Sequence, residues 1–307
     1  MKYWRQTLIG ILACLLLLST YLFVYEPQYA GTIPPWTGTE IYAHRGFGSY
    51  APDNSKLAVE IGLQNGFTGF DLDGQFTRDG ELIIYHDLSV DRLTSGTGKV
   101  ANKTLAEMLT LDLAPKFNSS LQGAYVATFE DVLKTIDGKA VLMVELKVTG
   151  LGETGIEQRA ASIIEKYDAY DTVYLSSFNP IVLYRLKQID PRIKTVLIFM
   201  DTNWNPALLA EIPNPDDRVD LPWMIRQEFI RRAMRKIIKP DLLSVNHEVD
   251  PATRARLIEH GWPVFLWTPN DSQNISHALE QQPFGLITDE PVLARELLIK
   301  GIVNGTN

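Results

Sequence analysis

Short apolar runs alternate with helical patterns from residue 40 to the end of the chain, and this alternation constrains the fold more than any other feature. It is typical of β–α–β units that build a mainly parallel sheet. The length of this region suits one barrel of eight such units. We therefore predict a TIM (β/α)8 barrel over residues 40–300. Its candidate strands are residues 41–43, 68–73, 82–86, 141–147, 173–178, 195–199, 242–246, 264–268 and 285–288.

Nine candidate strands are one too many for a closed barrel of eight. The link between the second and the third strand, residues 77–81, is too short for a parallel crossover, and its Asp79-Gly80 pair is typical of a hairpin turn. We expect the strand that ends at His86 to pair antiparallel to its predecessor or to lie at the barrel mouth. Residues 87–127 show weak periodicity, which predicts a small insertion after the third strand.

An uncharged apolar run at residues 8–25 precedes this domain. As a helix it spans roughly 27 Å, just enough for a bilayer core. Lys2 and Arg5 precede it, so the positive-inside rule places the N-terminus in the cytoplasm and the barrel on the periplasmic or extracellular side. We predict a single-pass membrane anchor over residues 1–30 and a short, stiff linker over residues 31–39. A cleaved signal peptide is the alternative.

Charge and cysteine content exclude several classes of protein. The formal net charge of −8 argues against a nucleic-acid partner, which requires a basic surface. Cys14 is the only cysteine, so the chain forms no internal disulfide and no cysteine-based zinc site. The fold must therefore depend on the burial of apolar residues.

One segment departs from this acidic balance. Residues 226–239 (RQEFIRRAMRKIIK) contain six basic residues and one acidic residue. One interpretation is a face that docks on anionic lipid. The other, which we favour, is an outer barrel helix with a solvated basic face.

Polar side chains follow the ends of several predicted strands. In a parallel barrel these ends share the carboxyl-terminal rim, where active sites are found. Side chains alternate along a strand, so Asp71 and Asp73 face the same side. Carboxylates that converge there repel one another unless a cation neutralises them, and oxygen ligands favour Mg²⁺ or Ca²⁺. The polar residues are His44, Arg45, Asp71, Asp73, His86, Glu145 and Lys147.

The sequence resembles the glycerophosphodiester phosphodiesterase family over residues 40–298. The motifs that match in order are AHRGFGSYAPDNS, GFDLDGQFTRDGELIIYHD, RLTSGTG, VELK, SSFNP, LWTPN and GLITDEP. The resemblance implies a TIM barrel with a subdomain inserted after the His-Asp motif. It also implies a phosphoric diester hydrolase of lipid and glycerol metabolism, which cleaves glycerophosphodiesters to glycerol 3-phosphate and an alcohol.

The resemblance also implies roles for individual residues. His44 and His86 match the catalytic histidines, and Arg45 and Lys147 match the phosphate-binding cations. The implied metal ligands are Asp71, Asp73 and Glu145, and the implied aromatic lining of the pocket is Phe178 and Trp267. Asp71 and Asp53 fall where the family usually has glutamate. Because aspartate is shorter by one methylene, Ca²⁺ tolerates this change better than Mg²⁺ does.

The residue types suit phosphodiester chemistry. One histidine can deprotonate the nucleophile while the other protonates the leaving alkoxide, and the sequence leaves open which does which. It also leaves open whether the nucleophile is water or the neighbouring glycerol hydroxyl. Two other functions compete with this prediction. One is lysophospholipase D-type release of head groups from lysophospholipids, and the other is a non-catalytic barrel that binds phosphoglycerol.

Overall fold

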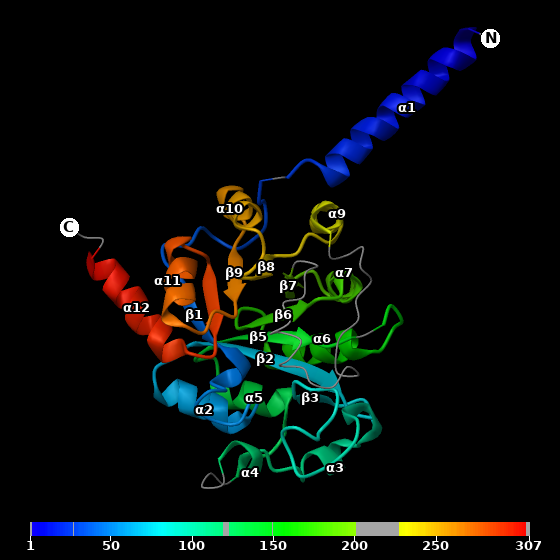
Figure 1. Cartoon of the computed structure of the whole chain (residues 1–307). Helices are drawn as coiled ribbons and strands as arrows, with labels where there is room; N and C mark the ends of the chain where they lie inside the picture. Colours follow the sequence, from blue (N-terminus) through cyan, green and yellow to red (C-terminus); the bar gives the residue numbers. More distant parts are fainter. Residues whose placement is uncertain (1, 27, 119–122, 149, 201–226, 305–307) are drawn as a thin grey trace.

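The computed structural model describes residues 2–26, 28–118, 123–148, 150–200 and 227–304, and it contains a closed barrel (Figure 1). Eight parallel strands pair in the order β1-β10-β9-β8-β7-β6-β5-β2, and pairing of β1 with β2 closes the ring. This confirms the predicted TIM barrel. The strands are β1 (Glu40–Ala43), β2 (Gly69–Phe76), β5 (Val141–Leu146), β6 (Val173–Ser177), β7 (Lys194–Phe199), β8 (Leu242–Asn246), β9 (Val264–Trp267) and β10 (Gly285–Thr288).

Two further strands extend the sheet beyond the barrel. β3 (Leu82–Ile84) pairs antiparallel with β2, which confirms the predicted hairpin. β4 (Ala127–Thr128), which the sequence did not predict, pairs antiparallel with β3. Between them lies the insertion, which has an apolar cluster of its own around Val90 and Met108. Its described elements are η2 (Val100–Asn102), α3 (Leu105–Met108) and α4 (Ala114–Phe117), and residues 119–122 lie outside the described residues.

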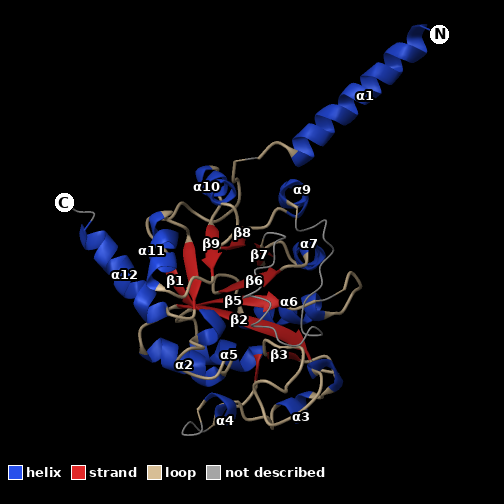
Figure 2. Cartoon of the chain, in the orientation of Figure 1, coloured by secondary structure: helices blue, strands red, loops and turns tan. Residues whose placement is uncertain are grey.

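Helices surround the barrel on its outer side (Figure 2). Side-chain caps begin several of them: Ser55, Thr128 and Asp250 each accept a hydrogen bond from a backbone N–H of the first helical turn. Such caps satisfy N–H groups that have no partner within the helix. The surrounding helices are α2 (Lys56–Gln64), α5 (Phe129–Ile136), α6 (Ile156–Tyr167), α7 (Pro180–Ile189), α9 (Glu228–Ile238), α10 (Pro251–Glu259), α11 (Ser272–Glu280) and α12 (Pro291–Asn304).

Strand alternation divides the core into two layers. Phe70 and Leu72 of β2 belong to the large cluster between strands and helices. Tyr42, Met143 and Phe265 belong to a second cluster contributed by barrel strands. Asp71 and Asp73 alternate with the first pair and therefore face the barrel interior. The polar site thus lies above this second apolar cluster, which packs between the barrel strands and holds them in place.

The basic segment forms an outer helix, as predicted, but its basic residues are only partly solvated. Arg231 and Arg235 of α9 are buried. Arg235 donates to Glu26 and Glu228, which supply the buried negative charge. Glu26 lies 209 residues away in sequence, so the sequence pattern alone did not reveal this pairing. Arg226 lies outside the described residues.

The N-terminal helix α1 (Lys2–Phe23) ends two residues before the predicted end of the apolar run, and it projects away from the barrel (Figure 1). Its segment Gln6–Phe23 has a mean hydropathy of 2.0 and is long and apolar enough to cross a membrane. The chain that follows is attached to the barrel. Tyr29 N–H donates to the carbonyl of His260, and Thr39 Oγ1 donates to the carbonyl of Pro283.

Candidate active site

The turn after β1 places two predicted site residues at the barrel mouth. His44 and Arg45 belong to a short 3-10 turn, η1 (His44–Gly46). Arg45 adopts φ +50°, a conformation that is costly for a non-glycine residue and is found at functional sites. Gly46 follows with φ +78°, and a Cβ there would lie 3.0 Å from the Leu72 side chain. A glycine is therefore needed for the turn to pack against β2.

His44 is held by a carboxylate from the opposite end of the sequence. Its Nδ1 lies 2.6 Å from Oδ1 of Asp289, which directly follows β10. Because an ionised carboxylate only accepts, Nδ1 donates. Asn270 Nδ2 donates to the other oxygen of Asp289 and fixes that side chain. Burial, the largest single influence, lowers the pKa of His44, but the hydrogen bond to Asp289 and the nearby carboxylates together leave the pKa raised.

His86 has an equivalent partner. Its Nδ1 lies 2.7 Å from Oδ1 of Asp87, and Arg92 donates to both oxygens of Asp87. Gln75 of β2 donates to the carbonyls of Tyr85 and Asp87 and so holds this segment beside the barrel. Burial, reinforced by the charges of Arg45 and Lys147, lowers the pKa of His86 to about 4.

Arg45 links the turn after β1 to His86 and Asp53. Its Nη2 donates to Nε2 of His86 over 3.1 Å, and its Nη1 donates to Asp53 over 3.0 Å. Its Nε–H is buried and has no hydrogen-bond partner among the described residues. A buried donor without a partner is costly, so this N–H is suited to bind an anionic ligand.

The predicted carboxylates come from β2 and β5, which run side by side with Asp73 opposite Glu145. Asn54 clamps Asp73, since its amide donates to Oδ2 and its oxygen accepts from the Asp73 backbone N–H, both over 2.8 Å. Lys147 Nζ lies 3.0 Å from Asp73 and 3.1 Å from Glu145. Asp71 Oδ2 is 4.0 Å from Nε2 of His44.

The charges of these carboxylates are unevenly balanced. Burial would raise the pKa of Asp73, but Lys147 and other nearby cations hold it well below its usual range. Burial raises the pKa of Asp71 to about 8, because repulsion from Asp73 and Glu145 adds to it and His44 only partly offsets it. Burial also raises the pKa of Glu145. Positive charge therefore does not fully offset burial and mutual repulsion at Asp71 and Glu145, although Lys147 pairs with Glu145.

The two predicted aromatic residues also meet at this end of the barrel. Phe178 directly follows β6 and Trp267 ends β9, and their rings pack edge to face with centroids 5.8 Å apart. The indole Nε1–H of Trp267 has no hydrogen-bond partner among the described residues. The pair offers an apolar surface with one polar donor.

The carboxylates are not arranged as a ready-made metal centre. In the part of the chain that the structure describes, no group of three or more His, Cys, Asp or Glu side chains has the arrangement of a metal site. Lys147 Nζ lies between two of the predicted ligands instead. The oxygen donors and the incompletely balanced negative charge suit a hard divalent cation, but the Lys147 ammonium must move for a cation to contact both Asp73 and Glu145.

The structure thus brings the predicted site residues to one end of the barrel, and it adds residues that the sequence analysis did not select. The added residues are Asn54, Gln75, Asp87, Arg92, Asn270 and Asp289. Asp289 directly follows the barrel strand β10, as His44 directly follows β1.

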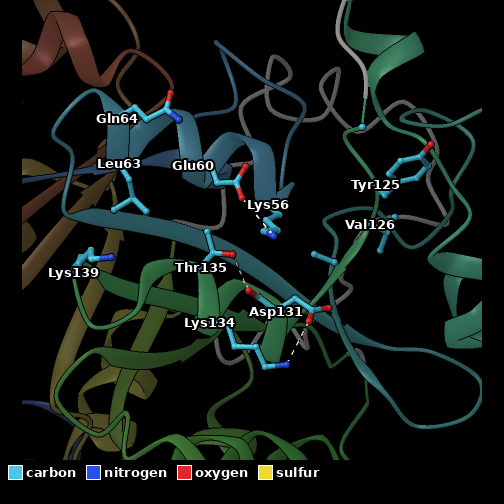
Figure 3. Close-up of a pocket in the computed structure, with 12 residues that line it drawn as sticks. Lys56, Glu60, Leu63, Gln64, Tyr125, Val126, Asp131, Lys134, Thr135 and Lys139 are labelled. Atoms are coloured by element: carbon cyan, nitrogen blue, oxygen red, sulfur yellow. Dashed lines mark hydrogen bonds and ion pairs between the residues drawn. The ribbon is translucent and has the colours of Figure 1, made fainter.

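A surface pocket of about 780 Å³ lies elsewhere, between α2 and α5 (Figure 3). Charged side chains line it, among them Lys56, Glu60 and Asp131. Asp131 and Lys134 form an ion pair within it. None of the predicted site residues lines this pocket, so it is separate from the site at the rim.

Similarity to solved structures supports this fold. A glycerophosphodiester phosphodiesterase from Agrobacterium tumefaciens has a TM-score of 0.63 at 21% identity, covering 83% of this chain and 98% of that chain. A phosphodiesterase from Oleispira antarctica, solved in complex with the product sn-glycerol-3-phosphate, has a TM-score of 0.68 at 20% identity, covering 85% and 97%. Both likenesses concern the fold alone.

Sequence similarity identifies the family. A glycerophosphodiester phosphodiesterase from Caldanaerobacter subterraneus subsp. tengcongensis is 28% identical over 267 residues, which cover 86% of this chain and 99% of that protein. Human glycerophosphodiester phosphodiesterase 1 is 29% identical over 224 residues, which cover 69% of this chain and 65% of that protein. The family model described as "Glycerophosphoryl diester phosphodiesterase family" matches residues 44–293. The chain therefore belongs to the glycerophosphoryl diester phosphodiesterase family of enzymes, as the order of its motifs predicted.

Proposed function

We propose that this chain hydrolyses glycerophosphodiesters to glycerol 3-phosphate and an alcohol by histidine acid/base catalysis. One observation carries the proposal: two histidines, each tied through Nδ1 to a carboxylate, lie at the same end of the barrel as Arg45 and Lys147. The family membership and the product bound to the Oleispira antarctica phosphodiesterase support the same reaction.

We assign the general base to His86. A guanidinium only donates, so Nε2 of His86 accepts from Arg45 and carries a lone pair. The proton of the ring therefore resides on Nδ1, which donates to Asp87. A substrate phosphate competes for the guanidinium of Arg45, and the lone pair released on His86 can take the proton of the nucleophile. The nucleophile is either water or the neighbouring glycerol hydroxyl; attack by the hydroxyl forms a cyclic phosphate, which water must then open to give glycerol 3-phosphate.

We assign the general acid to His44. Its Nδ1 donates to Asp289, and its Nε2 faces a carboxylate oxygen of Asp71 at 4.0 Å. The negative charge of Asp289, which raises the pKa of His44, favours a ring that carries protons on both nitrogens. As the nucleophile attacks phosphorus, the bond from phosphorus to the alcohol oxygen breaks, and that oxygen takes the Nε2 proton. Arg45 and Lys147 stabilise the negative charge that develops on the phosphoryl oxygens.

We further propose that Asp71, Asp73 and Glu145 hold a divalent cation, Mg²⁺ or Ca²⁺. The support is the set of buried oxygen donors and the raised pKa of Asp71 and Glu145, which an added positive charge would lower. A bound cation would supply electrostatic stabilisation of the phosphate. Asp71 in place of the usual glutamate favours Ca²⁺ over Mg²⁺.

The membrane is part of this proposal. We propose that α1 anchors the enzyme, with its N-terminus in the cytoplasm and the barrel in the periplasmic or extracellular space. Support comes from the apolar segment Gln6–Phe23 and from Lys2 and Arg5 before it. Protease accessibility of the barrel in intact and in permeabilised cells measures this topology.

A phosphodiesterase assay on the full chain tests the reaction. Glycerophosphocholine should be cleaved, excess EDTA should abolish turnover, and Ca²⁺ should restore it at least as well as Mg²⁺. Unchanged turnover in EDTA would remove the cation from the mechanism. Faster release of choline from lysophosphatidylcholine than from glycerophosphocholine would favour the lysophospholipase D reaction instead. Binding of glycerophosphocholine without turnover under any metal condition would indicate a non-catalytic barrel.

A further inference from the structure

Helix α9 has an outward face that the catalytic site does not use. Phe229 and Ile237 are 49% and 61% exposed on it. Arg232 and Lys236 lie between them, and a helix places residues at this spacing on one side. Arg231, Arg235 and Ile238 lie on the opposite, buried side. The outward face therefore combines two large apolar side chains with two cationic ones.

This face lies against the end of α1. The rings of Phe23 and Phe229 are 6.0 Å apart. Arg232 Nη1 donates to the carbonyl of Val24 over 3.0 Å, and Lys236 Nζ donates to the carbonyls of Leu22 and Tyr25. Because a helix leaves its last carbonyls without internal partners, these cations cap the end of α1.

The position of α1 then fixes the position of α9. The apolar segment Gln6–Phe23 is just long enough for the hydrocarbon core, so Phe23 lies at the membrane boundary when the segment spans. A ring 6.0 Å from Phe23 must lie in the headgroup region. In Figure 1, α9 is seen end-on whereas α1 runs across the picture, so α9 lies across the anchor rather than along it. A helix in the plane of the interface has this orientation.

The charge around α9 matches an anionic surface. Two carboxylates, Glu26 and Glu228, contribute to a group that contains five cations, so positive charge is in excess. The cations are Arg231, Arg232, Arg235, Lys236 and Arg256. Long cationic side chains beside exposed apolar ones are typical of interfacial helices.

We propose that the outward face of α9, formed by Phe229, Arg232, Lys236 and Ile237, contacts the lipid headgroups of the membrane that α1 spans. The partner is an anionic bilayer surface. The contact would hold the barrel against the membrane by one side instead of leaving it on a free tether. This inference rests on the proposed anchoring by α1.

Single-cysteine labelling of the full chain in vesicles tests the contact. Cys14 is the only cysteine and lies within the apolar segment, so the native chain labelled there reports on the anchor. In a Cys14→Ser background, Phe229→Cys and Ile237→Cys report on α9. Leu109→Cys is the matched control, since Leu109 is 40% exposed and directly follows α3, a helix that lies far from α1 in Figure 1. Each site carries an environment-sensitive fluorophore in phosphatidylcholine–phosphatidylglycerol vesicles that contain nitroxide-labelled lipid.

We expect lipid quenching at positions 229 and 237 to be at least about threefold stronger than at position 109, because interfacial side chains lie within reach of lipid-borne quenchers. Quenching at 229 and 237 that equals quenching at 109, with strong quenching at 14, would overturn the contact while the anchor stands. Absence of quenching at 14 would overturn the anchor and the contact together. Protection of 229 and 237 from both lipid-borne and aqueous quenchers would show that another copy of the chain covers this face, which also overturns the proposal.

Discussion

Two groups of buried charges in this protein differ in how completely they are neutralised. In the anchor cluster, the carboxylate of Glu228 accepts from Arg235 over 2.8 Å, and its arginine neighbours outweigh burial and lower its pKa. In the rim cluster, burial and neighbouring carboxylates raise the pKa of Asp71 to about 8. The anchor cluster is Glu26, Glu228, Arg232, Arg235 and Arg256. The rim cluster is His44, Arg45, Asp71, Asp73, His86, Glu145 and Lys147.

This difference separates a cluster with a structural role from a cluster that is suited to catalysis. Each carboxylate of the anchor cluster is surrounded by arginines, so the cluster can hold two segments together without a ligand. The rim cluster keeps a carboxylate, Asp71, short of positive charge. Buried N–H groups without a hydrogen-bond partner among the described residues occur in both clusters: Arg45 Nε in the rim cluster, and Arg235 Nη1 and Arg256 Nε in the anchor cluster. A buried carboxylate short of positive charge, which a bound cation would relieve, is thus the feature that distinguishes the site.

The largest expected effect comes from removing a member of the rim cluster. His86→Ala should lower kcat for glycerophosphocholine by about 10²–10⁴-fold, because general base catalysis contributes this much. The free energy of unfolding should change little, since the lost ring leaves Asp87 paired with Arg92. Steady-state kinetics and urea unfolding of the same preparation measure both quantities.

A histidine outside the site provides the control. His277 is exposed on α11 and pairs only weakly with Glu280, at 3.5 Å. His277→Ala should leave kcat and stability unchanged. Near-normal turnover by the His86 variant would remove His86 from the mechanism.

A variant in the anchor cluster should lose stability but keep its turnover. Glu26→Ala leaves buried Arg235 without one of its two carboxylate partners, and breaking a buried pair in this way costs about 3–5 kcal/mol. Turnover per folded molecule should be unchanged, because the rim cluster does not contact Glu26. Urea unfolding and the assay on the same protein measure both.

An exposed ion pair is the matched control for that variant. Glu60 and Lys56 pair at 3.5 Å on the surface of α2, so Glu60→Ala should cost no more than about 1 kcal/mol. If the Glu26 and Glu60 variants were equally stable, the anchor cluster would not hold the N-terminal segment to the barrel. If Glu26→Ala lowered kcat, the two clusters would not be independent.

Local patterns were sufficient to predict most of the barrel. Each of its strands is an apolar run bounded by polar or turn residues, and the Asp79-Gly80 turn predicted the antiparallel β3. The strand β4 was missed because it contains only Ala127 and Thr128, and Thr128 also caps α5. A strand of two residues has no alternation to detect.

Charge pairing between distant segments could not be predicted in the same way. Asp289 and His44 are separated by 245 residues, and Glu26 and Arg235 by 209. Strand-end position identified His44 as a rim residue, and Asp71 was placed there although β2 continues past the predicted end at residue 73 to Phe76. The partner of each depends on the register of the closed barrel. The sequence therefore predicted the residues that carry the chemistry better than those that hold them in place.

Asp289→Asn tests whether the carboxylate beside His44 contributes to catalysis. Asp289 acts through His44 as a positioning residue, so kcat should fall by about 10–100-fold with little change in KM. The negative charge of Asp289 raises the pKa of His44, so its removal lowers that pKa. The acidic form of His44 is then lost at a lower pH, and the alkaline limb of the kcat–pH profile should shift to lower pH. A uniformly lower profile without a shift would assign Asp289 a purely structural role.

The smallest expected effect concerns the aromatic surface beside the rim cluster. Trp267→Phe keeps an aromatic ring against Phe178 but removes the stronger cation–π partner and the free indole N–H. If the choline group lies on this ring, KM for glycerophosphocholine should rise about threefold to tenfold. KM for glycerophosphoglycerol, whose head group is uncharged, should change less. An equal rise for both substrates would mean that Trp267 contacts the shared glycerol phosphate, through its N–H or its ring face. The ratio of the two effects therefore locates the alcohol end of the substrate relative to β9.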